Sequence, residues 1–96
     1  STPTIMKDCS HVFHQYVIRV KNGRRDNLAS YLSEHGIGSA IHYPIPVHEQ
    51  PVFSHLNNPT CPVSSQSAQE VLSLPVYPGL SETELKYICD VINRWS

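Results

Sequence analysis

Residues 11–37 read HVFHQYVIRVKNGRRDNLASYLSEHGI, which contains the signals of a strand, a turn and a helix in succession. β-Branched and aromatic residues are dense from His11 to Val20, which predicts a strand. Asn22-Gly23 then predicts a turn. From Arg25 to His35, apolar residues recur at spacings of three and four, so this segment is predicted to form a helix with one apolar stripe.

The buried faces and the helix end can be predicted as well. One face of the strand is expected to point inward, and it carries Val12, Tyr16, Ile18 and Val20. Gly36 is placed to adopt the left-handed conformation just past the helix, and Ile37 can then fold back onto Leu32. The strand and the helix are therefore expected to share one apolar core.

The middle of the chain alternates short elements with proline. A second strand is predicted around Ser39 to Tyr43, and the proline-rich segment that follows, residues 44–62, is expected to contain at most single helical turns. Ser64 to Val71 is predicted to form a short helix with Ser64 or Ser65 as its N-cap. Leu72 to Leu74 is predicted to be a brief third strand, and Pro75 is expected to end it.

The clearest helix follows Ser81, because Ser81 and Glu84 fit a capping box. Its buried stripe is predicted to consist of Leu85, Ile88, Cys89, Ile92 and Trp95. The complete order is β-α-β-loop-α-β-α, which predicts an α+β domain with a three-stranded sheet and helices packed on one face. We assign residues 1–10 to a lead-in or linker and residues 11–96 to this single domain.

Composition excludes several classes of protein. The formal net charge is −1 and the seven basic residues are spread out, so no nucleic acid or anionic membrane is expected as a partner. Three distant cysteines without a CxxC pair indicate free thiols, as in a reducing cytoplasm. No transmembrane or signal segment is predicted. The chain begins with Ser1 and not Met, which leads us to expect a piece of a longer protein.

Residues 42–51, HYPIPVHEQP, are the most unusual part of the sequence. Prolines can hold polar side chains rigidly at the end of a strand, although a surface loop stiffened by proline would have the same composition. No metal site is predicted, because His11 and His14 would lie on opposite faces of a strand. His42 and His48 have no Cys or Asp near them at a zinc-binding spacing. The chain also lacks a nucleophile motif and a glycine-rich phosphate loop.

Three blocks of the sequence resemble one family. Residues 25–37 match the pattern R-x-x-L-x-x-x-L-x-x-x-G-I, residues 42–51 match H-Y-P-x-P-x-H-x-Q-P, and residues 70–81 match E-V-L-S-L-P-x-Y-P-x-L-[ST]. In this order and spacing, the blocks resemble the C-terminal small domain of the DegT/DnrJ/EryC1/StrS aminotransferases. One block alone would be weak evidence, whereas three in order indicate the family.

The resemblance implies a function and its partners. Members are fold-type I enzymes that use pyridoxal phosphate (PLP) to aminate a keto group on a nucleotide-linked sugar, with glutamate or glutamine as the amino donor. They form homodimers with active sites at the subunit interface. By resemblance, His42, Tyr43 and His48 are expected to lie near the substrate or the cofactor phosphate. The proline-rich loop is then expected to form one wall of the cleft, leaving Ile45, Val47 and Phe53 exposed in this chain.

The catalytic residues themselves are expected to lie outside this chain. In the family the lysine that binds PLP belongs to a large domain, and Lys7, Lys21 and Lys86 match no such context. No catalytic residue and no PLP are therefore assigned to this chain, and alone it is expected to be inactive. The family often has an acidic residue just before the helix that leads into the L-S-L-P strand, and this chain has Ser65 there. Two alternatives remain: a freestanding module that binds a small ligand or a protein, and a non-catalytic regulator of the same family.

Overall fold

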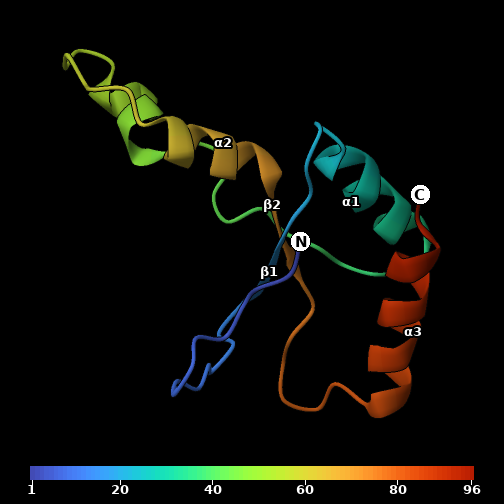
Figure 1. Cartoon of the computed structure of the whole chain (residues 1–96). Coiled ribbons are helices and arrows are strands. Elements are labelled where there is room, and N and C mark those ends of the chain that lie inside the picture. Colours follow the sequence, from blue (N-terminus) through green and yellow to red (C-terminus); the bar gives the residue numbers. More distant parts are fainter.

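The computed structural model describes all residues from 1 to 96 (Figure 1). It contains a two-stranded sheet, three α-helices and two short 3-10 helices. In chain order these elements are β1 (Tyr16–Arg19), α1 (Arg25–Glu34), η1 (Val47–Glu49), η2 (Pro51–Phe53), α2 (Pro62–Glu70), β2 (Val71–Leu74) and α3 (Glu82–Arg94). The α+β class is confirmed, and the proline-rich segment contains only single helical turns, as predicted.

The predicted three-stranded sheet is wrong, because only β1 and β2 form a ladder. They are antiparallel, with Ile18 opposite Leu72. The segment expected to be the other strand contributes a single bridge: the Ala40 N–H donates to the Ser73 carbonyl at 3.1 Å, and the Ser73 N–H donates to the Ala40 carbonyl at 2.7 Å. Pairing extends no further, because glycine at 38 weakens a strand and proline at 44 has no N–H to donate.

Strand β1 is shorter than predicted, because the chain becomes extended only at Tyr16 and not at His11. Phe13 has a φ of 46°, in the left-handed region, and its N–H donates to the His11 Nδ1 at 2.8 Å. This local turn leaves Val12 exposed, contrary to the prediction. The inward face is otherwise confirmed, since Ile18 and Val20 are buried and the residue at 16 packs against them.

The helix end at Gly36 forms as predicted. Gly36 has a φ of 73°. Its N–H donates to the Ser33 carbonyl at 3.0 Å, and the Ile37 N–H donates to the Leu32 carbonyl at 2.9 Å. These two bonds make a Schellman motif, and Ile37 and Leu32 lie in one apolar cluster. The predicted turn before α1 is also confirmed, because Asn22 is left-handed with a φ of 62°.

Helix α3 begins with the predicted capping box. The Glu84 N–H donates to the Ser81 hydroxyl at 3.1 Å, and the Ser81 N–H donates to the Glu84 carboxylate at 2.8 Å. The buried stripe is displaced from the predicted one, because Leu85 and Cys89 are exposed whereas Val91 is fully buried. The residues of α3 and its C-cap that contact the core are Ile88, Val91, Ile92 and Trp95.

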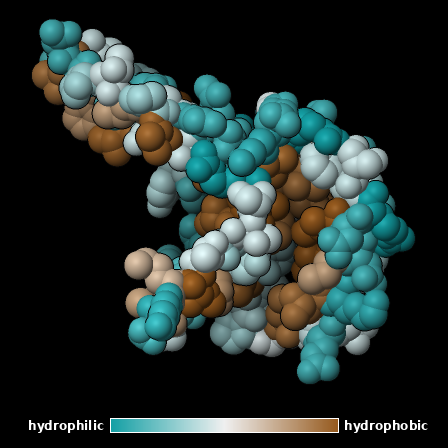
Figure 2. Space-filling model, viewed as in Figure 1, coloured by the Kyte–Doolittle hydropathy of each residue, from teal (hydrophilic) through white to brown (hydrophobic).

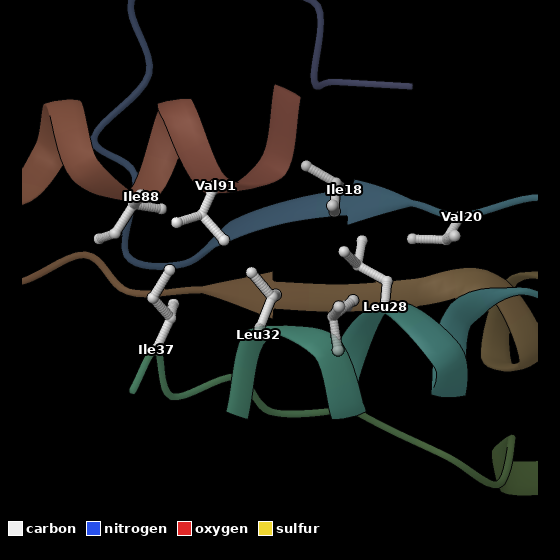
Figure 3. Close-up of a cluster of buried hydrophobic side chains, with 8 residues drawn as sticks. Ile18, Val20, Leu28, Leu32, Ile37, Ile88 and Val91 are labelled. Carbon is white, nitrogen blue, oxygen red and sulfur yellow. The ribbon is translucent and has the colours of Figure 1, made fainter. Parts of the chain in front are cut away.

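The core lies between α1, α3 and one face of the sheet (Figure 3). Leu28 and Leu32 of α1 approach it from one side, and Ile88 and Val91 of α3 approach it from the other (Figure 3). The eight buried members of this cluster are Ile18, Val20, Leu28, Leu32, Ile37, Leu72, Ile88 and Val91. Packing of helices on one face is thus confirmed for α1 and α3.

Helix α2 departs from the prediction in both position and start. It runs from the beginning of β2 away from the sheet, with η1 and η2 at its far end (Figure 1). It starts at Pro62, and neither Ser64 nor Ser65 caps it, since the N-cap is Cys61 and no side-chain cap hydrogen bond forms there. Proline is well suited to the first position of a helix because the missing N–H would be unpaired there. We call residues 44–70 the projecting arm.

The arm is joined to β1 by a partly buried ion pair. The Arg19 guanidinium lies 2.7 Å from the Glu70 carboxylate, and the Gln66 amide donates to the same carboxylate at 2.9 Å. These bonds, from Gln66 first and Arg19 second, hold the pKa of Glu70 below its usual value, against the opposing effect of burial. Because the folded-state pKa is lowered, the ionised Glu70 stabilises the fold at neutral pH, and this contribution is lost as the carboxyl is protonated.

We therefore expect Glu70→Gln to reduce the loss of stability in acid. The variant should be less stable than the wild type at pH 7, and the difference should shrink below about pH 5. Urea unfolding followed by circular dichroism at pH 7 and at about pH 3.5 measures this. The matched control is Glu34→Gln, because Glu34 is exposed and makes no side-chain bond. An equal pH dependence in wild type and Glu70→Gln would contradict the prediction.

Candidate functional site

His42 is held against the middle of β2. Its Nδ1 lies 3.1 Å from the Ser73 hydroxyl. Leu72 and Leu74 point toward the core, so the intervening Ser73 points to the opposite face of the sheet, where His42 lies. The single bridge between Ala40 and Ser73 brings the chain to this place two residues before His42. The histidine ring is therefore fixed on one nitrogen and exposed elsewhere.

Tyr43 lies beside His42 and is open to solvent. The two rings meet edge to face, with centroids 5.7 Å apart. The Tyr43 side chain is 74% exposed and its hydroxyl has no partner within the chain. An exposed phenol hydroxyl next to an imidazole can donate hydrogen bonds to a bound ligand.

His48 is engaged inside the projecting arm. It lies in η1, where its Nε2 is 3.3 Å from the Glu49 carboxylate and 3.4 Å from the Ser65 hydroxyl. The Ser65 hydroxyl donates to Glu49, so Ser65 ties η1 to α2. The Asn58 amide also donates to the His48 carbonyl at 3.1 Å. His48 thus contributes to the internal structure of the arm in addition to any contact with a ligand.

The three predicted residues line one hollow. A cavity of about 680 Å³ between residues 42–61 and α2 is lined by His42, Tyr43 and His48 together with apolar residues such as Phe53. Volumes of this size accommodate small organic ligands. The structure therefore brings together His42, Tyr43 and His48, although it shows no direct contact of His48 with the other two.

His42 also lines a second hollow that the sequence did not predict. This cavity, of about 580 Å³, lies where the end of β2 faces the loop after α1 and the start of α3. Ser73, Tyr77 and Tyr87 line it. Tyr77 falls within the block of residues 70–81, so its position could have been found there, whereas nothing in the sequence singled out Tyr87. His42 is the residue at which the two hollows meet.

The acidic residue that lines the second hollow, Glu84, has a structural role. Its carboxylate caps α3. Hydrogen bonds from the Ser81 backbone and then the Ser81 hydroxyl hold the pKa of Glu84 below its usual value. Glu84 is therefore an ionised structural group and not a proton donor at neutral pH.

The structure gathers no three His, Cys, Asp or Glu side chains that could hold a metal ion. The cysteines at 9, 61 and 89 are all free thiols. No lysine lines either hollow. None of the helices is long and apolar enough to cross a membrane.

The projecting arm carries exposed apolar side chains. Figure 2 shows hydrophobic atoms along the arm, outside the core between the sheet and helices. The predicted patch is confirmed, since Ile45 is 42% exposed, Val47 is 73% exposed and Phe53 is 36% exposed. Other large apolar residues exposed on the arm are Val52, Leu56 and Val63. Exposed apolar patches are typical of interaction sites.

The DegT/DnrJ/EryC1/StrS aminotransferase family matches residues 1–93. The dTDP-3-amino-3,6-dideoxy-alpha-D-galactopyranose transaminase of Aneurinibacillus thermoaerophilus is 40% identical over 97% of this chain and 25% of its own length. The UDP-N-acetyl-3-dehydro-alpha-D-glucosamine 3-aminotransferase of Acidithiobacillus ferrooxidans is 45% identical over 88% of this chain and 22% of its own length. A pleiotropic regulatory protein of Geobacillus stearothermophilus is 41% identical, with coverages of 95% and 24%.

Solved structures agree with these relatives. The crystal structure of S. venezuelae DesV in complex with a ketimine intermediate superposes with a TM-score of 0.86 and 33% identity, over 98% of this chain and 25% of that chain. A DegT DnrJ EryC1 StrS aminotransferase from Brucella abortus gives a TM-score of 0.71 and 37% identity, over 82% and 21%. The chain thus spans about a quarter of the length of its relatives.

Proposed function

Because the chain belongs to the DegT/DnrJ/EryC1/StrS aminotransferase family, we propose that it is the small domain of a PLP-dependent enzyme that transfers an amino group to a nucleotide-linked keto sugar. The match over residues 1–93, with only a quarter of each relative covered, carries this proposal. The names of two relatives, a dTDP-sugar transaminase and a UDP-sugar aminotransferase, support the substrate class. The free thiols fit a cytoplasmic location.

His42, Tyr43 and His48 are proposed to bind the substrate. A nucleotide-linked sugar offers phosphate and hydroxyl oxygens, which accept hydrogen bonds from imidazole N–H and phenol O–H groups. His42, which lines both hollows, and Tyr43, which lines the larger one, present such groups side by side. His48 also lines the larger hollow, from within the arm.

The residues of this chain do not fit a complete PLP site. A lysine would be needed to bind the cofactor covalently, yet Lys86 is exposed and paired with Asp90 at 2.7 Å on α3. Lys7 and Lys21 are exposed and lie outside the hollow at which His42, Tyr43 and His48 meet. We therefore assign PLP and the catalytic lysine to the large domain of the parent protein, and an amino-acid donor is expected to react there.

The apolar side of the projecting arm is proposed to dock onto the remainder of the parent protein. The relatives are about four times as long as this chain, so a large domain is expected to contact it. Covering Val47 and Phe53 would remove apolar surface from water, which stabilises an interface by about 25 cal/mol per Å². In this arrangement the arm forms one wall of the substrate cleft, next to the interface of a homodimer.

A second function is favoured by one relative. The pleiotropic regulatory protein of Geobacillus stearothermophilus is 41% identical to this chain, so the same small domain also occurs in a protein named for regulation. A freestanding ligand-binding module is the other alternative. Both predict that the complete protein does not transfer amino groups.

The test is an amino-transfer assay of the complete parent protein with a nucleotide-linked keto sugar and glutamate. We expect turnover, and we expect His42→Ala to lower kcat/KM for the sugar by about tenfold to a hundredfold, because a hydrogen bond to a charged oxygen is lost. The matched control is His11→Ala, because His11 is exposed and bonds only Phe13. Absence of turnover with dTDP- and UDP-linked keto sugars would support the regulatory alternative.

A further inference from the structure

His42 has one side-chain partner, and this partner is buried. Its Nδ1 lies 3.1 Å from the Ser73 hydroxyl, which bonds no other side chain. Ser73 is only 7% exposed, whereas Tyr43, the residue after His42, is 74% exposed. One ring nitrogen of His42 is thus bound from beneath, and Nε2 is the nitrogen that remains for a ligand.

Ser73 is held rigidly in place. It lies in β2 opposite Val17 of β1, and on its other side it exchanges two backbone hydrogen bonds with Ala40, at 2.7 and 3.1 Å. Three hydrogen bonds therefore connect Ser73 to the segment that carries His42, two through Ala40 and one through the imidazole. A hydroxyl on a paired strand can fix the orientation of the ring more firmly than a loop residue could.

The burial of Ser73 also selects the tautomer of His42. If the Nδ1–H donated to the Ser73 oxygen, the hydroxyl hydrogen would need another acceptor, and this hydroxyl makes no hydrogen bond to any other group of the chain. A buried polar hydrogen without an acceptor is destabilising, because its hydrogen bond to water is lost and not replaced. If Ser73 donates to an unprotonated Nδ1, every polar group of the pair is satisfied, and the hydrogen of the neutral ring lies on Nε2.

We infer that Ser73 is a positioning residue that presents the Nε2–H of His42 as a hydrogen-bond donor toward an acceptor oxygen of the substrate. This inference rests on the proposed function, because it requires that His42 faces the substrate. The ligand chemistry is that of a phosphate, hydroxyl or carbonyl oxygen, all of which accept a hydrogen bond. Ser73 itself touches no substrate and acts only through His42.

The first test measures the kinetics of the complete parent protein with Ser73→Ala and Ser73→Thr. Loss of one hydrogen bond of ordinary strength is expected to lower kcat/KM for the nucleotide-linked sugar about fivefold in Ser73→Ala. Ser73→Thr retains the hydroxyl on a strand-compatible side chain, so it should restore most of the loss. The matched control is Ser30→Ala on the exposed surface of α1, which should leave kcat/KM unchanged.

The second test reads the tautomer directly and does not depend on activity. In the complete protein with ¹⁵N-labelled histidine, the imidazole correlations of His42 are identified by their absence in His42→Gln. We expect a protonated Nε2 and an unprotonated Nδ1 in the wild type and in Ser73→Thr, and a mixture of tautomers in Ser73→Ala.

The outcomes separate the inference from the proposed function. An unchanged tautomer in Ser73→Ala overturns the inference, whatever the kinetics, because any loss of activity would then be a general structural effect. If the protein transfers no amino groups, the proposed function fails, and the tautomer alone decides the inference. A changed tautomer with rescue by Ser73→Thr supports it.

Discussion

Replacing Leu32 by alanine is expected to destabilise the isolated chain by about 2–5 kcal/mol, the range for leucine in a packed core. Leu32 is fully buried, and its carbonyl accepts the Ile37 N–H that ends α1. Only nine hydrophobic residues of the 96 are buried, so the chain has few other contacts to compensate for the cavity. Since small domains are stable by about 5–15 kcal/mol, this loss would leave a large fraction unfolded in mild denaturant.

Urea unfolding measured by far-UV circular dichroism, with fluorescence of the single tryptophan Trp95 as a second probe, gives the change in unfolding free energy. The matched control is Leu85→Ala, which makes the same chemical change on α3. Leu85 is 50% exposed, so its replacement is expected to cost less than about 1 kcal/mol. Equal losses in the two variants would contradict the assignment of the core.

Local signals explain why much of the fold could be predicted from the sequence. The capping box at Ser81 and Glu84 and the left-handed Gly36 involve residues three to five apart, so the sequence contains both partners of each interaction. Most of the features predicted wrongly depend on distant partners. The stripe of α3 is centred on Val91, because the sheet covers only that side of the helix and leaves Leu85 outside.

The sheet illustrates the same limit. Residues near Ala40 have the composition of a strand, yet only one pair forms with Ser73, and the number of pairs depends on how the chain leaves toward the arm. The turn at Phe13 is a different case, because its partner His11 is only two residues away. It replaces the predicted start of β1 through a contact that hydrophobic periodicity does not encode.

In the candidate site too, some residues could be predicted from a local block of sequence and others could not. His42, Tyr43 and His48 lie in one block of ten residues, so a resemblance of that block was sufficient to select them. Ser73 is 31 residues from His42, and only the folded chain brings its hydroxyl to the imidazole. Tyr87 comes from α3, on the far side of the second hollow, and likewise no pattern in the sequence connects it to the site.

The isolated chain is expected to show no amino transfer, whereas the complete parent protein should be active with the same substrates. The reason is chemical: without a lysine positioned against PLP, the cofactor cannot be held for the reaction. None of the three lysines of the chain lines the hollow that holds His42, Tyr43 and His48. The measurement is a coupled assay of 2-oxoglutarate formation from glutamate, together with the absorbance spectrum of PLP after gel filtration.

The control separates a missing residue from a misfolded chain. Circular dichroism must first show that the isolated chain is helical, with a cooperative unfolding transition. A folded chain without turnover and without retained PLP agrees with the assignment of both to the large domain. Turnover that disappears in Lys86→Ala would contradict it, because Lys86, now paired with Asp90 on the exposed side of α3, would then have to reach the cofactor. Such a result would relocate the reaction from the His42 hollow to the surface of α3.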